Sequence, residues 1–417
     1  MTTPLKDTRI LLGVTGSIAC YKAVDLASKL HQSGALVDVV LTQSAEQFLS
    51  PLTFQSLTGR PAYTDSGLWG AEGHVLHVGL AQDAELLVIA PITANTIAKI
   101  ACGIADNLLT LTVLAAGCPV IIAPAMDGGM YSNPATQSNL EILKTRGVIV
   151  VGPAEGHLAS GLTGLGRMLE TQSIFGHVRH LLSREGILKG RKFVVTAGPT
   201  QEPIDPVRFI SNFSSGKQGF ALAQAALDKG AKVTLIAGPV NLSTPIGVDR
   251  IDVKTSMEMN AAVLAEVKDA DALVMAAAVS DYSPKDVMEN KIKKGAGNLS
   301  LNLKMNPDIL SNVSELRSKT QKPAVCVGFS AESQNLKENA KNKMLHKNLD
   351  LMVANDITAS DSGFNVNTNR VTLLYPDGRS EDLPLMSKFE VADTVMERIA
   401  IILSQKAGQP QIGTSPF

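Results

Sequence analysis

The chain carries two histidines, His74 and His77, three positions apart in a segment rich in glycine and apolar residues. A histidine side chain has a pKa near ~6.5, so it can exchange protons at neutral pH and act as a general acid or base. The same pair could be two surface imidazoles, or a metal pair if the segment is helical. Helical zinc pairs usually lie four positions apart, and no third ligand stands nearby in the sequence, so the spacing argues against a metal.

Two further clusters have the composition of anion-binding sites. The segment Ser214-Ser215-Gly216-Lys217 directly precedes a predicted helix, whose first backbone N–H groups could bind an anion. Lys291, Lys293 and Lys294 form the second cluster, shortly after Asp281. Either cluster could instead be solvated surface, the first as a polar loop and the second as a charged face. The three lysines could equally hold a triphosphate.

The elements that position these residues follow the same order in both halves of the chain. Residues 9–42 read as an apolar strand, a glycine-containing turn, an amphipathic helix and a second strand. The order returns from residue 192 onward. The two helices have apolar faces at Ala19, Ala23, Leu26, Ala27 and Leu30, and at Gly219, Leu222, Ala223 and Ala226. This repetition predicts two Rossmann-like α/β domains, each a mainly parallel sheet in a three-layer arrangement with helices.

Further apolar strands end in polar loops. A strand that begins at Leu86 leads into a predicted loop with Thr93, Asn95 and Thr96. A strand that begins near Pro119 leads into a Pro/Gly-rich loop with Met126, Met130 and Tyr131. Ligands of parallel sheets gather at the carboxyl ends of the strands, so these loops and the glycine-rich turn after the first strand predict one site.

The composition of the chain fits more than one sizeable core. Its 417 residues correspond to two or three domains at roughly 100–200 residues each. Hydrophobic residues make up 45% and charged residues 18%, and the net charge of −1 gives no electrostatic sign of nucleic-acid or anionic-membrane binding. The longest apolar stretches are far short of the ~20 residues that span a bilayer, and no signal peptide opens the chain, so we expect a cytoplasmic protein.

The cysteines give no sign of a disulfide framework or a zinc site. Cys20, Cys102, Cys118 and Cys326 occur without a CxxC pair. We expect each of them to be a small buried residue in a reducing cytosol, and none stands out as a nucleophile.

Five motifs occur in order within residues 5–182: GVTGSIACYK, APITANT, IADNLL, PAMDGGMY and LASGLTGLGRM. Together they resemble the flavin-containing cysteine decarboxylases, in particular the phosphopantothenoylcysteine decarboxylase family. The resemblance implies a flavodoxin-like domain that binds FMN. It places the FMN phosphate at Gly16, Ser17 and Ile18, and the rest of the flavin pocket at Thr42, Thr93, Asn95 and Ala125.

The resemblance also implies a catalytic histidine and a substrate site. In the family the histidine lies eight residues before the acidic residue that opens the APITANT strand, a spacing that His77 has relative to Glu85. His74 is the neighbouring candidate. Substrate contacts fall on Asp127, Ala159 and Gly161, and the proton donor on Ser160. If FMN oxidises the cysteinyl thiol to a thioaldehyde, the charge left by decarboxylation can delocalise onto sulfur.

This chain departs from the family pattern at two of these positions. The family has an asparagine that contacts the substrate carboxylate where this chain has Asp127, and two facing carboxylates repel unless one is protonated or a cation intervenes. The family has a proton-donating cysteine where this chain has Ser160, and a hydroxyl is a much poorer acid than a thiol. Two hypotheses follow: a variant subgroup with rearranged substrate contacts, or a flavin-binding structural or regulatory half that does not complete decarboxylation.

The motifs GPT, EPIDPVRFISN, SSGKQG, AAAVSDY, KIKK, NPDIL, GFSAES and KNLDLMVAND follow in order across about 190–360. They resemble phosphopantothenate–cysteine ligase. The resemblance implies that CTP activates the phosphopantothenate carboxylate as an acyl-cytidylate, which the amine of cysteine attacks. It places nucleotide contacts at Ala277, Asp281, Lys291, Phe329, Lys343 and Lys347.

Catalytic roles in the second half also come from this resemblance. Lys291 would stabilise charge on the reacting phosphoryl group, while Arg208 and Asn212 would engage phosphopantothenate or the acyl intermediate. Phosphoryl chemistry needs its charge neutralised, so Mg²⁺ is expected, with Asp281 as an indirect ligand.

The two resemblances imply consecutive steps, because the ligase makes phosphopantothenoylcysteine and the decarboxylase converts it to 4′-phosphopantetheine. Family members form trimers through the first half and dimers through the second, which implies a dodecamer. A flavin prenyltransferase shares the first fold, but the attached ligase argues against it. A dinucleotide dehydrogenase is disfavoured because neither opening loop has the GxGxxG motif or its ribose-binding acid.

A change in composition predicts the domain boundary. The segment from residue 183 to 192 is polar, contains glycine and lacks periodicity. We therefore expect a decarboxylase domain at 1–182, a linker at 183–190 and a ligase domain at 191–403. Residues 404–417 are rich in Gly, Pro, Ser and Gln, which predicts a disordered tail.

Overall fold

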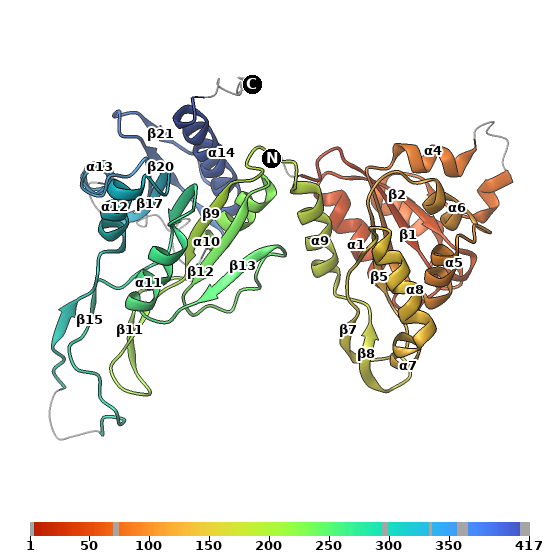
Figure 1. Ribbon diagram of the computed structural model, residues 1–417, viewed down its shortest axis with the longest axis horizontal. Helices are drawn as coiled ribbons and strands as arrows, with labels where there is room; N and C mark the ends of the chain where they lie inside the picture. The colour runs from red at the N-terminus through yellow and green to blue at the C-terminus, as the bar shows by residue number, and fades with distance from the viewer. Residues whose placement is uncertain (1–3, 70–74, 294–298, 333–335, 357–365, 409–417) are drawn as a thin grey trace. The chain divides into compact units, whose positions relative to one another are not determined.

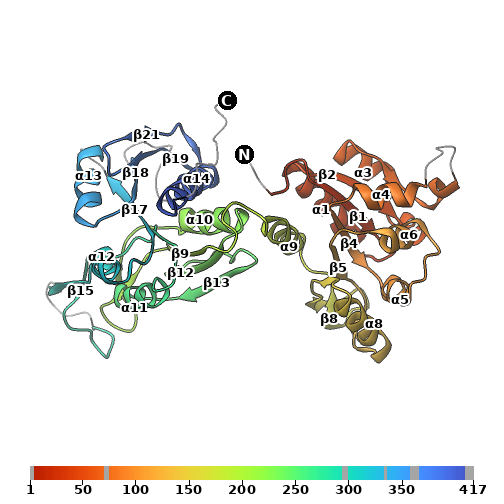
Figure 2. The same cartoon turned by 45° about the horizontal axis from the view of Figure 1, so that its top comes forward.

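The computed structural model describes residues 4–69, 75–293, 299–332, 336–356 and 366–408 of the chain (Figure 1). The chain divides into two compact units, with the break between Leu182 and Ser183. Each unit has its own mainly parallel sheet between two layers of helices (Figures 1 and 2). The predicted α/β class with two three-layer domains is confirmed.

The first unit contains a six-stranded parallel sheet in the order β3-β2-β1-β4-β5-β6. Its strands are β1 (Arg9–Val14), β2 (Leu36–Leu41), β3 (Ala62–Tyr63), β4 (Leu86–Ile92), β5 (Val120–Pro124) and β6 (Ile149–Val150). Successive side chains of a strand point to opposite faces, so Leu12 packs on one helix layer and Leu11 on the other. The layers are α1 (Cys20–Gln32), α3 (Pro51–Thr58) and α9 (Thr171–Ser183), and α4 (Leu76–Asp83), α5 (Ala94–Cys102), α6 (Leu108–Ala115) and α8 (Pro134–Thr145).

Short elements complete the first unit. They are α2 (Gln43–Glu46), a 3-10 helix η1 (Asp65–Trp69), α7 (Gly128–Ser132) and an antiparallel hairpin of β7 (Ala154–His157) and β8 (Thr163–Arg167). Figure 1 shows this hairpin projecting from the sheet beside α7. The predicted apolar face of α1 is confirmed, because Ala23, Leu26, Ala27 and Leu30 are buried.

The second unit contains an eight-stranded sheet in the order β13-β12-β9-β14-β17-β18-β20-β21. Its strands are β9 (Lys192–Ala197), β12 (Lys232–Ala237), β13 (Val248–Asp252), β14 (Ala272–Met275), β17 (Val325–Glu332), β18 (Leu351–Asp356), β20 (Val371–Leu374) and β21 (Ser380–Asp382). The first six in spatial order are parallel, and β20 and β21 are antiparallel. One face packs on α10 (Lys217–Asp228) and α14 (Lys388–Lys406), the other on α11 (Ser256–Glu266), α12 (Ile309–Thr320) and α13 (Leu336–His346).

Three small antiparallel pairs extend from the second sheet. They are β10 (Gln201–Pro203) with β11 (Phe209–Ser211), β15 (Tyr282–Pro284) with β16 (Leu303–Met305), and β19 (Thr368–Asn369) with β22 (Met386–Ser387). The first pair lies in the polar segment between β9 and α10. Its two strands satisfy each other's backbone groups, which a long polar loop would otherwise leave to water.

Capping residues shift two predicted loops into helices. The Thr93 side chain accepts a hydrogen bond from the Thr96 backbone N–H, so α5 begins at Ala94 and Asn95 lies in its first turn. Asp127 caps α7 in the same way, which places Met130 and Tyr131 in a short helix. The loop assignments were wrong for Asn95, Thr96, Met130 and Tyr131, because side-chain caps of this kind start a helix next to the strand end.

The segment between the units is not a free linker. Leu188 is only 2% exposed and belongs to the core of the second unit, and its backbone N–H donates to the Lys229 carbonyl over 2.6 Å. At the carboxyl end α14 continues to Lys406, three residues past the predicted domain end at 403. Apolar side chains of α14 such as Leu403 are buried, which holds its last turn in place. Residues 409–417 of the predicted tail lie outside the described residues.

The cysteine prediction is correct for two positions and wrong for two. Cys20 and Cys326 are buried, whereas Cys118 is half-buried and Cys102 is exposed at the end of α5. The buried face of α5 includes Ala101, so the next residue points outward. Burial raises the pKa of the Cys20 and Cys118 thiols and raises that of Cys326 to about 12, which does not suit a nucleophile. Within the described residues, no helix is long and apolar enough to cross a membrane.

Candidate functional site

A threonine joins two strand ends in the first unit. The strand order reverses between β1 and β4, because β2 and β3 lie on one side of β1 and β4 to β6 on the other. Such a switch point is where ligands of open parallel sheets bind. The Thr15 hydroxyl donates to the Pro91 carbonyl over 2.9 Å and accepts from the Thr93 backbone N–H over 3.0 Å. The turns after β1 and β4 are therefore held together as one platform.

The turn after β1 is shaped for an anion. Ala19 begins α1 without a side-chain cap, and the first turn of α1 has no acidic residue. Gly16 lies so close to Ser44 that an added Cβ would come within 2.3 Å of the Ser44 Cβ. Ser17 and the exposed Ile18 complete the turn. An uncapped helix N-terminus behind a close-packed glycine turn suits a phosphate, as predicted for Gly16, Ser17 and Ile18.

The other predicted flavin residues lie at neighbouring strand ends. Thr42 follows β2, Thr93 follows β4, and Ala125 follows β5 with its backbone N–H donating to the Ile92 carbonyl over 3.0 Å. Asn95 is exposed in the first turn of α5. The Thr42 side chain is 8% exposed, and its hydroxyl has no hydrogen-bond partner among the described residues. A buried hydroxyl without a partner is costly, so this atom points to a ligand, and these residues fit FMN.

Ser160 and Asp127 are in direct contact. Ser160 lies at the tip of the β7–β8 hairpin, between Ala159 and Gly161, and its hydroxyl donates to Asp127 Oδ2 over 2.7 Å. The Gly129 backbone N–H donates to Asp127 Oδ1 over 2.9 Å. The bond from Ser160, and then that from Gly129, lowers the pKa of the Asp127 carboxyl, so it is ionised at neutral pH.

The base of the same hairpin is docked on the end of β5. The Met126 backbone N–H donates to the Gly166 carbonyl over 3.0 Å, and a Cβ on Gly166 would come within 2.3 Å of the Met126 carbonyl oxygen. After β8, the buried Lys22 ammonium of α1 donates to the Met168 carbonyl and to Glu170. The predicted substrate residues therefore lie on a hairpin that is fixed on both sides of its tip.

His77 does not lie beside this hairpin in the chain. It lies half-buried in the first turn of α4, which packs on α6. Figure 1 shows α4 at the opposite end of the first unit from α7 and β8, and Figure 2 also shows α4 apart from β8. His74 lies outside the described residues.

The second unit repeats the switch-point arrangement between β9 and β14. The Thr196 hydroxyl accepts from the backbone N–H groups of Ala276 and Ala277, each over 3.1 Å. The Thr200 hydroxyl accepts from the Ser280 N–H over 3.0 Å. Beyond them Gly216 precedes α10 as its N-cap residue; it is left-handed with φ 73° and provides no side-chain cap. This helix N-terminus, too, is open to an anion.

Arg208 and Lys291 are brought together by a buried carboxylate. Asp205 accepts from the backbone N–H groups of Val207 and Arg208, each over 2.8 Å, and from that of Ile292 over 3.2 Å. The Arg208 guanidinium in turn donates to the Ile292 carbonyl over 2.7 Å. Burial raises the pKa of Asp205, but these three backbone bonds outweigh it and the pKa is lowered. The segment that carries the exposed Lys291 is thus anchored on the turn that carries Arg208.

The remaining predicted ligase residues lie on several elements of the second unit. Ala277 and the exposed Asp281 follow β14, Phe329 lies half-buried in β17, and Lys343 is exposed on α13. Lys347, just past α13, forms an ion pair with Asp308 over 3.0 Å. The Asn212 amide donates to the Val279 carbonyl over 2.9 Å. Lys294 lies outside the described residues.

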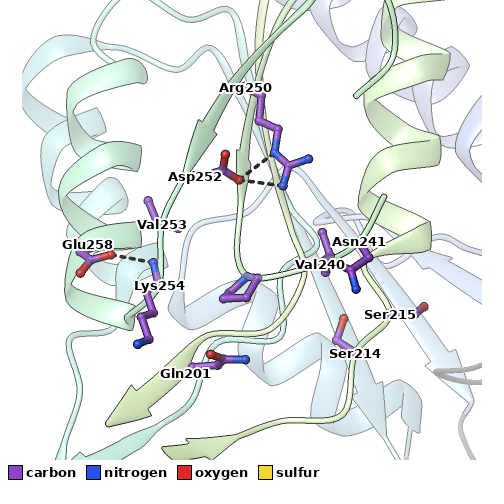
Figure 3. A pocket seen from close by; sticks show the side chains of 11 residues that line it. Gln201, Ser214, Ser215, Val240, Asn241, Arg250, Asp252, Val253, Lys254 and Glu258 are labelled. Carbon is purple, nitrogen blue, oxygen red and sulfur yellow. Dashed lines mark hydrogen bonds and ion pairs between the residues drawn. The ribbon is translucent and has the colours of Figure 1, made fainter. Parts of the chain in front are cut away.

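A cavity of about 780 Å³ lies at the ends of β12 and β13, which are on the other side of β9 in the sheet from β14 and β17 (Figure 3). Two contacts join lining residues: Arg250 forms an ion pair with Asp252 over 2.7 Å, and Glu258 accepts a hydrogen bond from the Lys254 backbone N–H over 2.6 Å. The lining residues are Gln201, Ser214, Ser215, Pro239, Val240, Asn241, Arg250, Asp252, Val253, Lys254 and Glu258. Ser214 and Ser215 belong to the predicted anion-binding segment Ser214–Lys217, so this segment borders the cavity.

Sequence reasoning missed the residues that organise these sites. Thr15, Thr196 and Thr200 each bind across a switch point, and Asp205 anchors two segments. In the sequence, the signal for the three threonines was their position at the ends of predicted strands. The signal for Asp205 was its place within the motif EPIDP. Among the described residues no three His, Cys, Asp or Glu side chains gather as a metal site.

Comparisons with known proteins match both units. Residues 1–183 match the family model described as Flavoprotein, and residues 188–402 match the DNA/pantothenate metabolism flavoprotein C-terminal domain. The coenzyme A biosynthesis bifunctional protein CoaBC of Vibrio cholerae is 46% identical over 95% of this chain and 98% of its own length. Its counterpart in Bacillus subtilis is 44% identical over 97% of this chain and 99% of its own length.

Solved structures are similar to each unit separately. The C-terminal domain of CoaBC is 36% identical, with a TM-score of 0.45, and covers 53% of this chain and 99% of its own. A PPC decarboxylase mutant complexed with pantothenoylaminoethenethiol is 37% identical, with a TM-score of 0.40, and covers 42% of this chain and 98% of its own. With full-length identity to two curated relatives and a family model on each unit, the chain belongs to the family of bifunctional coenzyme A biosynthesis proteins.

Proposed function

We propose that residues 1–182 and 191–403 divide two consecutive reactions of coenzyme A biosynthesis between them. The chain is a bifunctional enzyme that ligates phosphopantothenate to cysteine and decarboxylates the product. The observation that carries the assignment is the repeated site: each unit has an uncapped helix N-terminus beside a switch point held by threonine. One such site suits the phosphate of FMN, and the other a phosphate-bearing substrate.

In the ligase unit, CTP lies over the ends of β14 and β17, along Ala277 and Phe329. Lys291 stabilises negative charge on the reacting phosphoryl group, and Lys343 and Lys347 bind the nucleotide. The Asp205 anchor supports the role of Lys291, because it fixes the segment next to Arg208. Lys347 exchanges its ion pair with Asp308 for the nucleotide when CTP binds.

Phosphopantothenate extends from the switch point into the cavity beside Ser214 and Ser215. Arg208 and Asn212 hold its reactive end or the acyl-cytidylate, within reach of the amine of cysteine. The cavity supports this placement because Ser214 and Ser215, which follow Asn212 closely in the sequence, line it, and its volume of about 780 Å³ leaves room for part of an elongated polar molecule. Mg²⁺ arrives with CTP, because in nucleotide sites it is bound largely by phosphate oxygens and water, with Asp281 as an indirect contact.

In the decarboxylase unit, Gly16, Ser17 and Ile18 hold the FMN phosphate, and Thr42, Thr93, Asn95 and Ala125 line the rest of the flavin site. Bound FMN supplies the oxidation of the cysteinyl thiol that makes loss of CO₂ feasible. The unpartnered Thr42 hydroxyl donates to or accepts from the flavin. Asp127, Ala159, Ser160 and Gly161 shape the substrate side.

His77 acts as the acid–base residue from a neighbouring protomer. The separation of α4 from α7 and β8 supports this, since one protomer alone does not bring His77 to the hairpin. A trimer of the first unit supplies the missing histidine, and dimers of the second unit link trimers into a dodecamer. The four cysteines are free, which fits the reducing cytoplasm where we place the enzyme.

A mass-spectrometric time course on the purified chain tests the proposal. The protein receives 4′-phosphopantothenate, cysteine, Mg²⁺ and CTP, with ATP in a parallel reaction. We expect 4′-phosphopantetheine to accumulate with CTP. Failure to form phosphopantothenoylcysteine would contradict the ligase assignment.

One contact favours a second candidate for the first unit. Because the Ser160 hydroxyl donates its hydrogen bond to Asp127, its O–H is not directed at a substrate as an acid. A flavin-binding unit that serves a structural or regulatory role, fused to an active ligase, would stall at phosphopantothenoylcysteine. A unit that only completes oxidative decarboxylation would stall two hydrogens short of the final thiol.

A further inference from the structure

Ser160 and Asp127, the two positions at which this chain departs from the family pattern described above, are hydrogen-bonded to each other. Ser160 Oγ and Asp127 Oδ2 are 2.7 Å apart, although the residues are 33 positions apart in the sequence. Asp127 follows β5, and Ser160 lies at the tip of the β7–β8 hairpin. The contact therefore links two separate elements of the substrate side, and neither departure can be understood alone.

Both oxygens of the Asp127 carboxylate are engaged by protein donors. Oδ1 accepts from the Gly129 N–H over 2.9 Å and Oδ2 from the Ser160 hydroxyl. A carboxylate held by two donors keeps its charge within the protein and does not need to face the carboxylate of a substrate. The repulsion expected from an aspartate at this position is thereby avoided.

Ser160 becomes an oriented acceptor through this contact. A hydroxyl has one proton and two lone pairs, and here the proton is directed at Asp127. The lone pairs are left for a donor, and the reacting group of a cysteinyl substrate, its thiol, carries an S–H that can donate to them. The hydrogen bond from Met126 to Gly166 fixes the base of the hairpin. The hydrogen bond between Ser160 and Asp127 therefore positions only its tip.

We propose that Asp127 is a positioning residue that acts through Ser160, whose oriented Oγ accepts a hydrogen bond from the substrate thiol. This inference rests on the decarboxylase function proposed above. The two residues work as one unit: without Ser160, the identity of residue 127 no longer matters to the reaction.

The experiment is a mutant cycle in the full-length enzyme, with phosphopantothenoylcysteine supplied directly and kcat and KM of CO₂ release measured. In Asp127→Asn the amide keeps Oδ1 for Gly129 and turns a donor toward Ser160, which reverses the hydroxyl. We expect Asp127→Asn and Ser160→Ala each to lower kcat about tenfold, a typical coupling between contacting residues. The double variant should equal Ser160→Ala, and Ser160→Thr, which retains the hydroxyl, should retain kcat.

Controls separate this role from simple folding of the hairpin. Thr163→Ala changes an exposed residue of the same hairpin and should leave kcat unchanged. Flavin content and CMP release by the ligase should match the unsubstituted enzyme in every variant. Hydrogen exchange should increase at residues 158–162 in Asp127→Ala, while β7 and β8 keep their protection.

If the losses in kcat of the two single variants multiply in the double variant, Asp127 acts independently of Ser160. That result would overturn this inference but not the decarboxylase function. An unchanged kcat in Asp127→Asn would do the same. If the unsubstituted enzyme ligates but releases no CO₂ from phosphopantothenoylcysteine, the decarboxylase function fails, and the role of the pair fails with it.

Discussion

The two units use the same topology and the same device to hold it, yet they present different chemistry. In each, a threonine hydroxyl links the first strand to the strand across the switch point, and the following helix starts without a side-chain cap. The first site adds a buried hydroxyl, Thr42, and an internally paired carboxylate, Asp127. The second adds exposed cations, Lys291 and Lys343. The shared topology thus determines where each site lies, and the residues of the loops determine which chemistry the site can perform.

The loops differ in the way that they are fixed. The hairpin of the first unit is held at its base by Gly166 and at its tip by Ser160, so the substrate side is built on short, close contacts. In the second unit one buried carboxylate, Asp205, anchors the segment that carries Lys291. The proposed flavin site is therefore held by close packing, whereas the proposed nucleotide site is held by one buried carboxylate.

The largest expected effect is on the first site. His77→Asn should retain bound flavin and lose CO₂ release by roughly 10²–10⁴-fold, the range for removal of a general acid–base group. Ligase turnover should be unchanged, since that site lies in the other unit. CO₂ release and flavin absorbance check this, with His31→Asn, an exposed histidine of α1, as the matched control. Normal decarboxylation by His77→Asn would remove His77 from the mechanism.

The corresponding change in the second site is Lys291→Gln. It should lower ligase turnover by about 10²–10³-fold, because a preorganised charge at the reacting phosphoryl group is lost. Decarboxylation of supplied phosphopantothenoylcysteine and flavin content should stay normal. CMP formation from CTP is the measurement. The control is Lys285→Gln, which changes another exposed lysine six positions before Lys291. Equal losses in both variants would mean that general charge, rather than Lys291, carries the effect.

The shared threonines can be tested against each other. Thr15→Val leaves the Thr93 N–H and the Pro91 carbonyl without this partner, and Thr196→Val leaves two N–H groups. Leaving buried groups unpaired should lower the free energy of unfolding by about 1–3 kcal/mol in each case. Thermal unfolding should show the loss in the unit that carries the change.

Thr145→Val, at an exposed helix end, should change stability by less than about 0.5 kcal/mol. If Thr15→Val or Thr196→Val changes the free energy of unfolding as little as Thr145→Val, the two threonines do not stabilise their switch points in the same way.

Much of the fold could be predicted from the sequence because buried strands and helix faces repeat at fixed periods. The face of α1 and the parallel strands came from such patterns. Caps were harder, since Thr93 and Asp127 start helices where apolar periodicity is too short to detect. The Ser160–Asp127 bond could not be read at all, because no local pattern links residues on separate elements.

The smallest expected effect concerns pH at Asp205. Its folded pKa is lowered, so its stabilisation is fully present above the unfolded value near ~3.9 and is lost as pH falls through the folded pKa. Protection of the Val207, Arg208 and Ile292 amides from hydrogen exchange should therefore hold between pH 7 and about pH 4. In Asp205→Asn it should be weaker at pH 7 and lack this acid-dependent step. Asp286→Asn, an exposed carboxylate of the same projecting segment, should behave like the unsubstituted chain. Protection that vanishes already near pH 6 would mean that Asp205 is not the anchor, and the contrast between a packed and a charge-held site would lose its support.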